Sequence, residues 1–153
     1  MKPHICHTSQ ETQSLGYRLG QALEGGTAIA LTGDLGAGKT TFTQGIARGL
    51  GLDESCPVTS PTFNIINEYP GRLRLCHLDL YRLADVEELE YIGFEDLLGD
   101  DSVIVVEWPG LLKEDRFEFD LEIQFEFDAD YNRVITCFAS GQRGSNVLSK
   151  LFS

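Results

Sequence analysis

Eight residues in the first third of the chain, 33–40, restrict its fold more than any other segment. They read Gly-Asp-Leu-Gly-Ala-Gly-Lys-Thr and match the pattern G-x-x-x-x-G-K-[ST], which requires a strand before it and a helix after it. Both flanks fit, because residues 27–32 form a short apolar run with strand character and residues 39–50 are predicted as a helix. This context predicts an α/β fold with a parallel sheet at its core.

The same loop predicts a binding site for the phosphates of a nucleotide. Glycines let backbone N–H groups curl around phosphate oxygens, and the helix N-terminus adds about half a positive charge. Lys39 is expected to reach the β- and γ-phosphates, and the Thr40 hydroxyl is expected to bind Mg²⁺. The predicted nucleotide-binding residues of this segment are Gly33, Asp34, Leu35, Gly36, Ala37, Gly38, Lys39, Thr40 and Thr41.

A loop of this kind needs a carboxylate for the metal, normally at the carboxyl end of a neighbouring strand. Asp79 ends an apolar run at 75–79, and Glu107 ends the β-branched run at 103–107. The second run has no polar alternation, which is typical of a strand buried on both faces of a parallel sheet. Either acid can bind Mg²⁺ or orient an attacking water, and the sequence does not distinguish the two roles. The alternative for each is a plain solvent-facing carboxylate.

Thr62 is a further candidate, in the segment Ser-Pro-Thr-Phe at 60–63 between the helix and the next strand. Switch loops place a threonine that senses the γ-phosphate in such a position. The alternative is an ordinary turn threonine.

Missing features narrow the class of nucleotide-binding protein. The chain has no N-K-x-D stretch for guanine, and Asp79 is not followed by the spacing D-x-x-G, so a common switch GTPase is disfavoured. Residues 83–112 carry nine acids and no base, which would serve a kinase for an anionic acceptor poorly. This acidic run is either a solvated face or a docking face for a basic partner. A small-molecule phosphotransferase and a nucleotide-gated binding module without turnover remain the alternatives to an ATPase.

The other segments complete the expected fold: a P-loop three-layer α/β sandwich, with antiparallel C-terminal strands, in one domain of residues 1–153. Thr8-x-x-Glu11 is a capping-box pattern that starts a helix, which Gly25 and Gly26 end. Further strands are predicted at 64–69, 73–79, 120–127 and 133–139, partial helix at 85–98 and a short helix at 145–152.

Composition bears on partners and location. The net charge of −12 argues against direct binding to nucleic acid or to an anionic membrane, both of which require clustered bases. No apolar stretch is long enough to span a membrane, and the N-terminus lacks the apolar region of a signal peptide. The four scattered cysteines indicate a cytoplasmic protein with reduced thiols. His4, Cys6 and His7 lack a second ligand pair at zinc spacing, so a short strand or arm is expected there.

Four motifs, in this order and at these intervals, together resemble the TsaE (YjeE) family, the ATPases of bacterial tRNA threonylcarbamoyladenosine biosynthesis. They are the loop segment 33–42, Ser-Pro-Thr-Phe at 60–63, His-Leu-Asp-Leu-Tyr-Arg-Leu at 77–83, and Val-Glu-Trp-Pro at 106–109. The resemblance spans residues 31–109, and the C-terminal hairpin matches only in general character.

The resemblance implies a function that composition alone does not. Members bind ATP with Mg²⁺ and associate with TsaB and TsaD, an assembly that attaches a threonylcarbamoyl group to adenosine 37 of tRNAs reading codons that begin with A. The transfer chemistry belongs to TsaD, and the ATPase, weak alone, resets the complex between turnovers. Contact with tRNA is expected to be indirect, through the complex.

Carried over by position, the family pattern assigns roles to individual residues. Asp79 matches the Walker B acid, Glu107 the carboxylate associated with the metal and with hydrolysis, and Thr62 the switch-loop threonine. Trp108 matches a tryptophan beside the nucleotide site, for which a core aromatic is the alternative. Phe63 stands where some members carry tyrosine.

Overall fold

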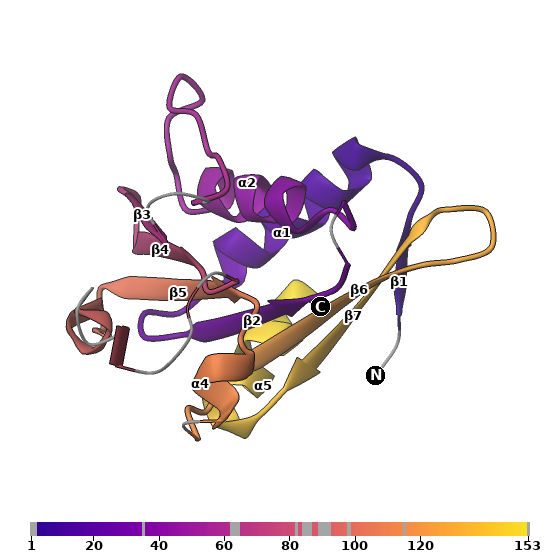
Figure 1. The fold of residues 1–153 in the computed structure, drawn as a ribbon. Coiled ribbons are helices and arrows are strands. Elements are labelled where there is room, and N and C mark those ends of the chain that lie inside the picture. Colours follow the sequence, from indigo (N-terminus) through magenta and orange to yellow (C-terminus); the bar gives the residue numbers. More distant parts are fainter. Residues whose placement is uncertain are drawn as a thin grey trace.

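The centre of the molecule is a seven-stranded sheet with the strand order β1-β7-β6-β2-β5-β4-β3 (Figure 1). The computed structural model describes residues 3–34, 36–61, 65–81, 83, 87–88, 93–97, 99–114 and 116–152. The strands are β1 (His4–Cys6), β2 (Ala28–Thr32), β3 (Ile66–Tyr69), β4 (Arg74–Asp79), β5 (Ser102–Glu107), β6 (Leu121–Phe127) and β7 (Arg133–Ala139).

The inner strands β6, β2, β5 and β4 are parallel to one another. The outer strands pair antiparallel: β3 with β4, β7 with β6 and β1 with β7. The predicted parallel core and the antiparallel C-terminal strands are therefore confirmed, and the strands predicted at 64–69 and 73–79 form an antiparallel pair. The N-terminal segment forms the expected short strand, at the edge of the sheet.

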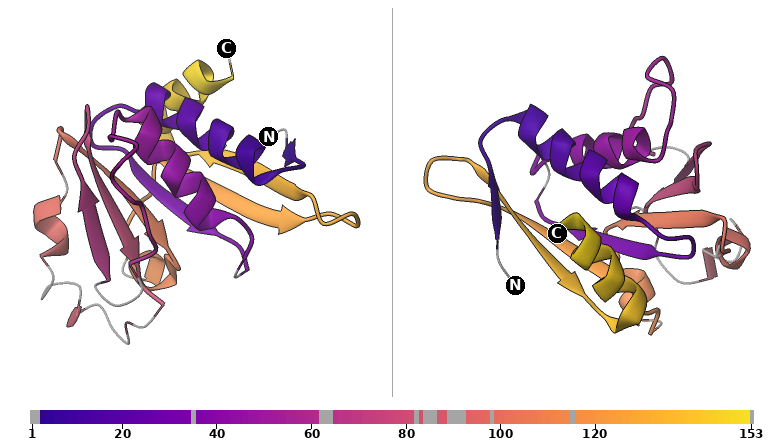
Figure 2. Two further views of the ribbon diagram at one scale, coloured as in Figure 1. Left: turned by 90° about the horizontal axis from the view of Figure 1, so that it is seen from above. Right: turned by 180° about the vertical axis from the view of Figure 1, so that it is seen from behind.

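Helices cover the sheet unequally. Those whose bounds lie within the described residues are α1 (Ser9–Ala22), α2 (Lys39–Gly49), α4 (Gly110–Glu114) and α5 (Gly141–Leu151), with a 3₁₀ helix η1 (Phe94–Leu97). Helices α1, α2 and α5 lie over one face of the sheet (Figure 2). Their apolar side chains share one buried core with β2 and β6. Residues of η1 and α4 share a second core with β2, β4 and β5 on the opposite face. The two cores separate three layers, as the fold class requires.

Local chemistry explains where the helices start. At α1 the predicted capping box is present: Thr8 Oγ1 accepts the Glu11 N–H at 3.1 Å, and the Glu11 carboxylate accepts the Thr8 N–H at 3.1 Å. Helix α5 begins at Gly141, four residues before the predicted start at 145. The helix is confirmed, but its predicted start was wrong because the first turn contains no apolar residue, so periodicity could not place it.

Helices α1 and α2 lie unusually close because glycines face each other across their contact. A Cβ at Gly16 of α1 would lie 2.2 Å from Phe42 O, and one at Gly45 of α2 would lie 2.1 Å from Gln13 O. Such contacts cannot be relieved without moving backbone. The packing of α1 therefore fixes where α2 and the loop before it sit over the sheet.

Of the partial helix expected at 85–98, the described residues contain η1 and a helical pair at Glu87 and Glu88. The remainder lies outside the described residues. All four cysteines are free, and burial raises the pKa of Cys76 and of Cys137 to about 11, so both are thiols at neutral pH. Among the described residues, no helix is both long and apolar enough to cross a membrane.

Candidate functional site

The glycine-rich loop and both candidate acids meet at one edge of the sheet. The loop follows the last residue of β2, and Asp79 and Glu107 are the last residues of β4 and β5. In the parallel ladders Asp79 lies opposite Glu107, and Glu107 lies opposite Leu31. The sequence-based expectation depended on these strands being parallel neighbours, and they are.

The conformation of the loop depends on its glycines. Gly33, Gly36 and Gly38 have φ values of 148°, 81° and 100°, a region that residues with a Cβ rarely adopt. At Gly33 a Cβ would also lie 2.7 Å from the backbone oxygen of Phe125 on β6.

The start of α2 is built to receive an anion. Gly38 is its N-cap, and no side chain among the described residues caps it. The first amide groups of the helix therefore lack the usual side-chain acceptor, and together with the loop backbone they fit a phosphate. Thr40 and Thr41, in the first turn, are half-buried.

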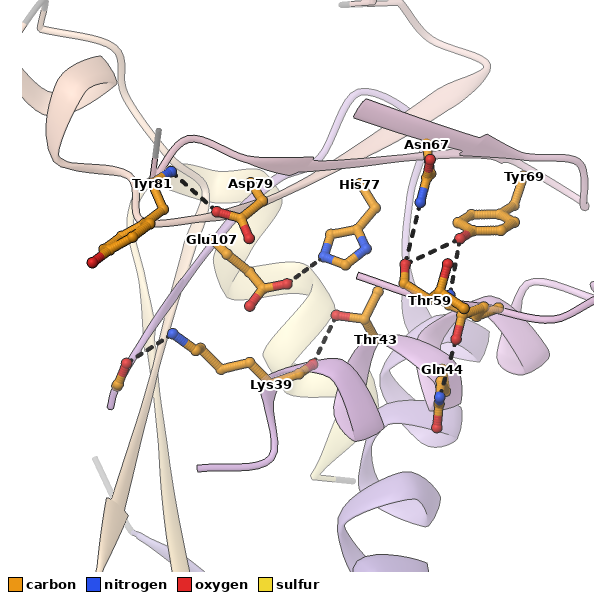
Figure 3. Close-up of polar contacts among 12 residues, drawn as sticks. Lys39, Thr43, Gln44, Thr59, Asn67, Tyr69, His77, Asp79, Tyr81 and Glu107 are labelled. Carbon is orange, nitrogen blue, oxygen red and sulfur yellow. Dashed lines mark hydrogen bonds and ion pairs between the residues drawn. The ribbon is translucent and has the colours of Figure 1, made fainter. Parts of the chain in front are cut away.

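Lys39 is a buried cation, with only 5% of its surface exposed. Its Nζ donates to the backbone oxygen of Gly33 at 2.8 Å (Figure 3). The same Nζ lies 4.3 Å from the centre of the Trp108 ring. A buried ammonium group requires such partners. Neither partner is an anion, so the charge of Lys39 is available to a negatively charged ligand.

The Glu107 carboxylate is held by a residue of the neighbouring strand. Its Oε2 lies 2.6 Å from Nε2 of His77, and both residues are buried. Asp79 is half-buried, and its Oδ1 accepts the Tyr81 N–H at 3.0 Å.

Trp108 adopts φ 58°, a left-handed conformation that is strained for a bulky residue and that recurs at functional sites. The exposed ring of Tyr81 packs against it with the ring centres 5.0 Å apart. Trp108 therefore lies beside Lys39 as well as directly after Glu107. Trp108 is half-buried.

Thr40, Asp79 and Glu107 are a donor set suited to Mg²⁺, which proteins usually hold through one or two carboxylates together with substrate phosphates and waters. Among the described residues, no three histidine, cysteine or acidic side chains are grouped to hold an ion by themselves. Leu35, Thr62 and Phe63 lie outside the described residues.

The sequence analysis did not single out two residues that the structure brings to the site. His77 was read only as part of a motif, although a histidine in an otherwise apolar strand next to an acid-ended strand is a usable signal. Arg133, the first residue of β7, places its Nε 3.6 Å from where a Cβ of Gly38 would be. Its distance of 95 residues from the loop in the sequence left no local signal.

The parallel core sheet and the glycine-rich loop between β2 and α2 define a P-loop protein of the α/β class. A family model described as "Threonylcarbamoyl adenosine biosynthesis protein TsaE" matches residues 6–135. The tRNA threonylcarbamoyladenosine biosynthesis protein TsaE of Treponema pallidum (strain Nichols) is 39% identical over 132 residues, covering 86% of this chain and 96% of the relative. The TsaE protein of Bacillus subtilis (strain 168) is 41% identical over 135 residues, covering 88% of this chain and 83% of the relative.

A solved structure agrees. The crystal structure of Bacillus subtilis YdiB matches with a TM-score of 0.83 and 33% identity, covering 99% of this chain and 93% of that one. The chain therefore belongs to the TsaE family of tRNA threonylcarbamoyladenosine biosynthesis. The resemblance seen in the four motifs is confirmed.

Proposed function

We propose that this protein binds and hydrolyses ATP, and that hydrolysis resets a TsaB–TsaD assembly between rounds of threonylcarbamoyl transfer to adenosine 37 of tRNA. The observation that carries the proposal is the edge of the sheet where the glycine-rich loop, buried Lys39 and the buried Glu107 carboxylate lie together. The loop supplies a binding site for phosphates. The Glu107 carboxylate, whose recorded hydrogen bond within the described part of the chain uses only Oε2, supplies a group that can act on water.

Individual residues have separate roles in binding and hydrolysing ATP. Backbone N–H groups of residues 33–41 and the Lys39 ammonium bind the β- and γ-phosphates, and Lys39 also stabilises charge that develops as the terminal phosphate is transferred to water. Glu107 orients the attacking water. Thr40, Asp79 and Glu107 would hold Mg²⁺, which supplies positive charge to the phosphate oxygens when bound. Thr62 would sense the γ-phosphate from a switch loop.

Partners follow from the family and from charge. The net charge of −12 supports docking to proteins rather than direct contact with tRNA, because a nucleic-acid surface would repel it. We accordingly place the chain, as one domain, in a cytoplasmic complex with TsaB and TsaD that contacts tRNA only through them.

The experiment that tests the proposal is multiple-turnover formation of threonylcarbamoyladenosine on tRNA. TsaB, TsaD, threonylcarbamoyl-adenylate and ATP are supplied, with no addition, with this protein, or with its Lys39→Ala variant. We expect product beyond the first cycle only with the intact protein. Turnover that is indifferent to the protein would contradict the proposal, and a screen of small acceptors for phosphorylation would follow.

Trp108 offers a direct report of nucleotide binding, because it is the only tryptophan of the chain and lies 4.3 Å from Lys39 Nζ. When Lys39 turns from this ring to a phosphate, the surroundings of the indole change. We expect the tryptophan emission to change on titration with ATP, with a midpoint equal to the Kd measured by calorimetry. Calorimetric binding without any change in emission would contradict the proximity of Trp108 to the bound nucleotide.

A further inference from the structure

A histidine that no proposed step uses is buried directly behind the candidate site. His77 is fully buried on β4, and its Nε2 lies 2.6 Å from Glu107 Oε2 (Figure 3). It precedes Asp79 by two residues, so both side chains leave the same face of the strand. The ladder places His77 opposite Val105, two positions before Glu107 on β5, and the contact is therefore diagonal across two parallel strands.

The hydrogen bonds of the ring indicate its tautomer. Nδ1 is buried and has no hydrogen-bond partner among the described residues. A neutral ring with its proton on Nε2 donates to Glu107 and leaves only an unpaired acceptor at Nδ1. An Nε2–H donor to Glu107 therefore fits the site.

This contact has a consequence for Glu107. A glutamate carboxylate turns freely about its last bond, because that rotation is broad. The carboxylate of Glu107 is buried, and within the described part of the chain its recorded hydrogen bond comes from His77. With Oε2 held at the back, Oε1 is the oxygen that remains for a ligand or a water.

We infer that His77 is a positioning residue: it fixes the Glu107 carboxylate so that a single oxygen serves the phosphate site. The inference rests on the proposed ATPase function and specifies how its acid is oriented. Partners of this kind, which orient a group that does the chemistry, typically change activity about 10- to 100-fold when removed. A histidine present only to fill the core would change stability and leave the chemistry intact.

The first test compares His77→Leu, His77→Gln and a control, Cys76→Ala. Cys76 is fully buried but its side chain belongs to the core on the other face of β4, so its truncation disturbs the strand without touching Glu107. We expect His77→Leu to lower the rate of ATP hydrolysis about 10- to 100-fold with the Kd for ATP unchanged. His77→Gln, whose amide can donate to Glu107, should recover part of the rate. Equal rates for His77→Leu and Cys76→Ala would overturn the inference.

A second comparison asks whether His77 acts through Glu107. In a Glu107→Gln background, His77→Leu should cause little further loss, because the group it orients has already been disabled. A second loss as large as that in the wild-type background would overturn the inference, since His77 would then act independently.

A third readout does not require hydrolysis. It distinguishes failure of the proposed role of His77 from failure of the proposed ATPase function. In full-length protein labelled with ¹⁵N-histidine, we expect one slowly exchanging ring proton on Nε2, absent in His77→Gln and shifted in Glu107→Gln. A ring proton on Nδ1, or none protected from exchange, would overturn the role of His77. Wild-type protein that shows the protected proton but hydrolyses no ATP with its partners present would instead contradict the proposed function.

Discussion

Lys39→Ala should abolish ATP hydrolysis and weaken ATP binding by about 10- to 100-fold. The substitution removes the buried ammonium group that lies beside the loop, and hydrogen bonds to charged groups contribute about 1.5–3 kcal/mol. At 1.4 kcal/mol for each factor of ten, this range corresponds to the expected loss of affinity. The rate falls further than the affinity because a preorganised charge at the site stabilises the transition state more than it stabilises bound ATP.

Titration calorimetry with ATP and phosphate release in the presence of TsaB and TsaD measure the two effects. Lys113→Ala is the matched control, because Lys113 is an exposed lysine of α4 that pairs with Glu122, away from the glycine-rich loop. It should retain both affinity and rate. A Lys39→Ala protein with wild-type affinity and rate would remove the loop from the proposed function.

The sequence predicted those parts of the site that are encoded by a local pattern. Strand β2, the loop and α2 follow one another along the chain, and the glycines, Lys39 and Thr40 carry the chemistry at fixed spacing. Asp79 and Glu107 could be proposed because each ends an apolar run, and a parallel sheet brings such ends to one edge.

The contacts that the sequence did not predict join distant residues. His77 and Glu107 are 30 positions apart and meet only because β4 and β5 are in one particular register. Arg133 reaches the loop only because the C-terminal hairpin folds back beside β2. Neither register is encoded in a local motif. The early start of α5 was missed for the opposite reason, since its first turn carries no periodic signal.

Burial gives the site its chemical character. Lys39 and Glu107 are both nearly excluded from water, where a charge is expensive unless it is partnered. Each charged group has its recorded partners on one side. Lys39 contacts Gly33 O and the Trp108 ring, and Glu107 contacts His77. A nucleotide and its water would complete the other side. Charges held in this way act on a substrate without first reorganising solvent.

Two substitutions of Glu107 should differ in their effect on stability. Glu107→Gln should lower ATP hydrolysis about 10²- to 10⁴-fold, the usual contribution of a positioned acid–base group, while the Kd for ATP changes by less than about tenfold. Glutamine keeps an oxygen that can accept the His77 N–H, so the fold should be retained. Glu107→Ala should show the same loss of rate and a lower free energy of unfolding, by about 1–3 kcal/mol, because it leaves buried His77 without a partner.

Phosphate release, nucleotide titration and thermal unfolding of both variants separate these effects, with Glu114→Ala on the exposed face of α4 as the control. Equal losses of rate and affinity in Glu107→Gln would make Glu107 chiefly a binding ligand, and the water-orienting role would then belong to Asp79. A Glu107→Gln protein with full activity would exclude proton transfer to Glu107 and binding of Mg²⁺ by its carboxylate, because the amide cannot take a proton from water and is a poor ligand for Mg²⁺. The difference between the two variants in unfolding free energy measures the contact with His77 apart from any effect on catalysis.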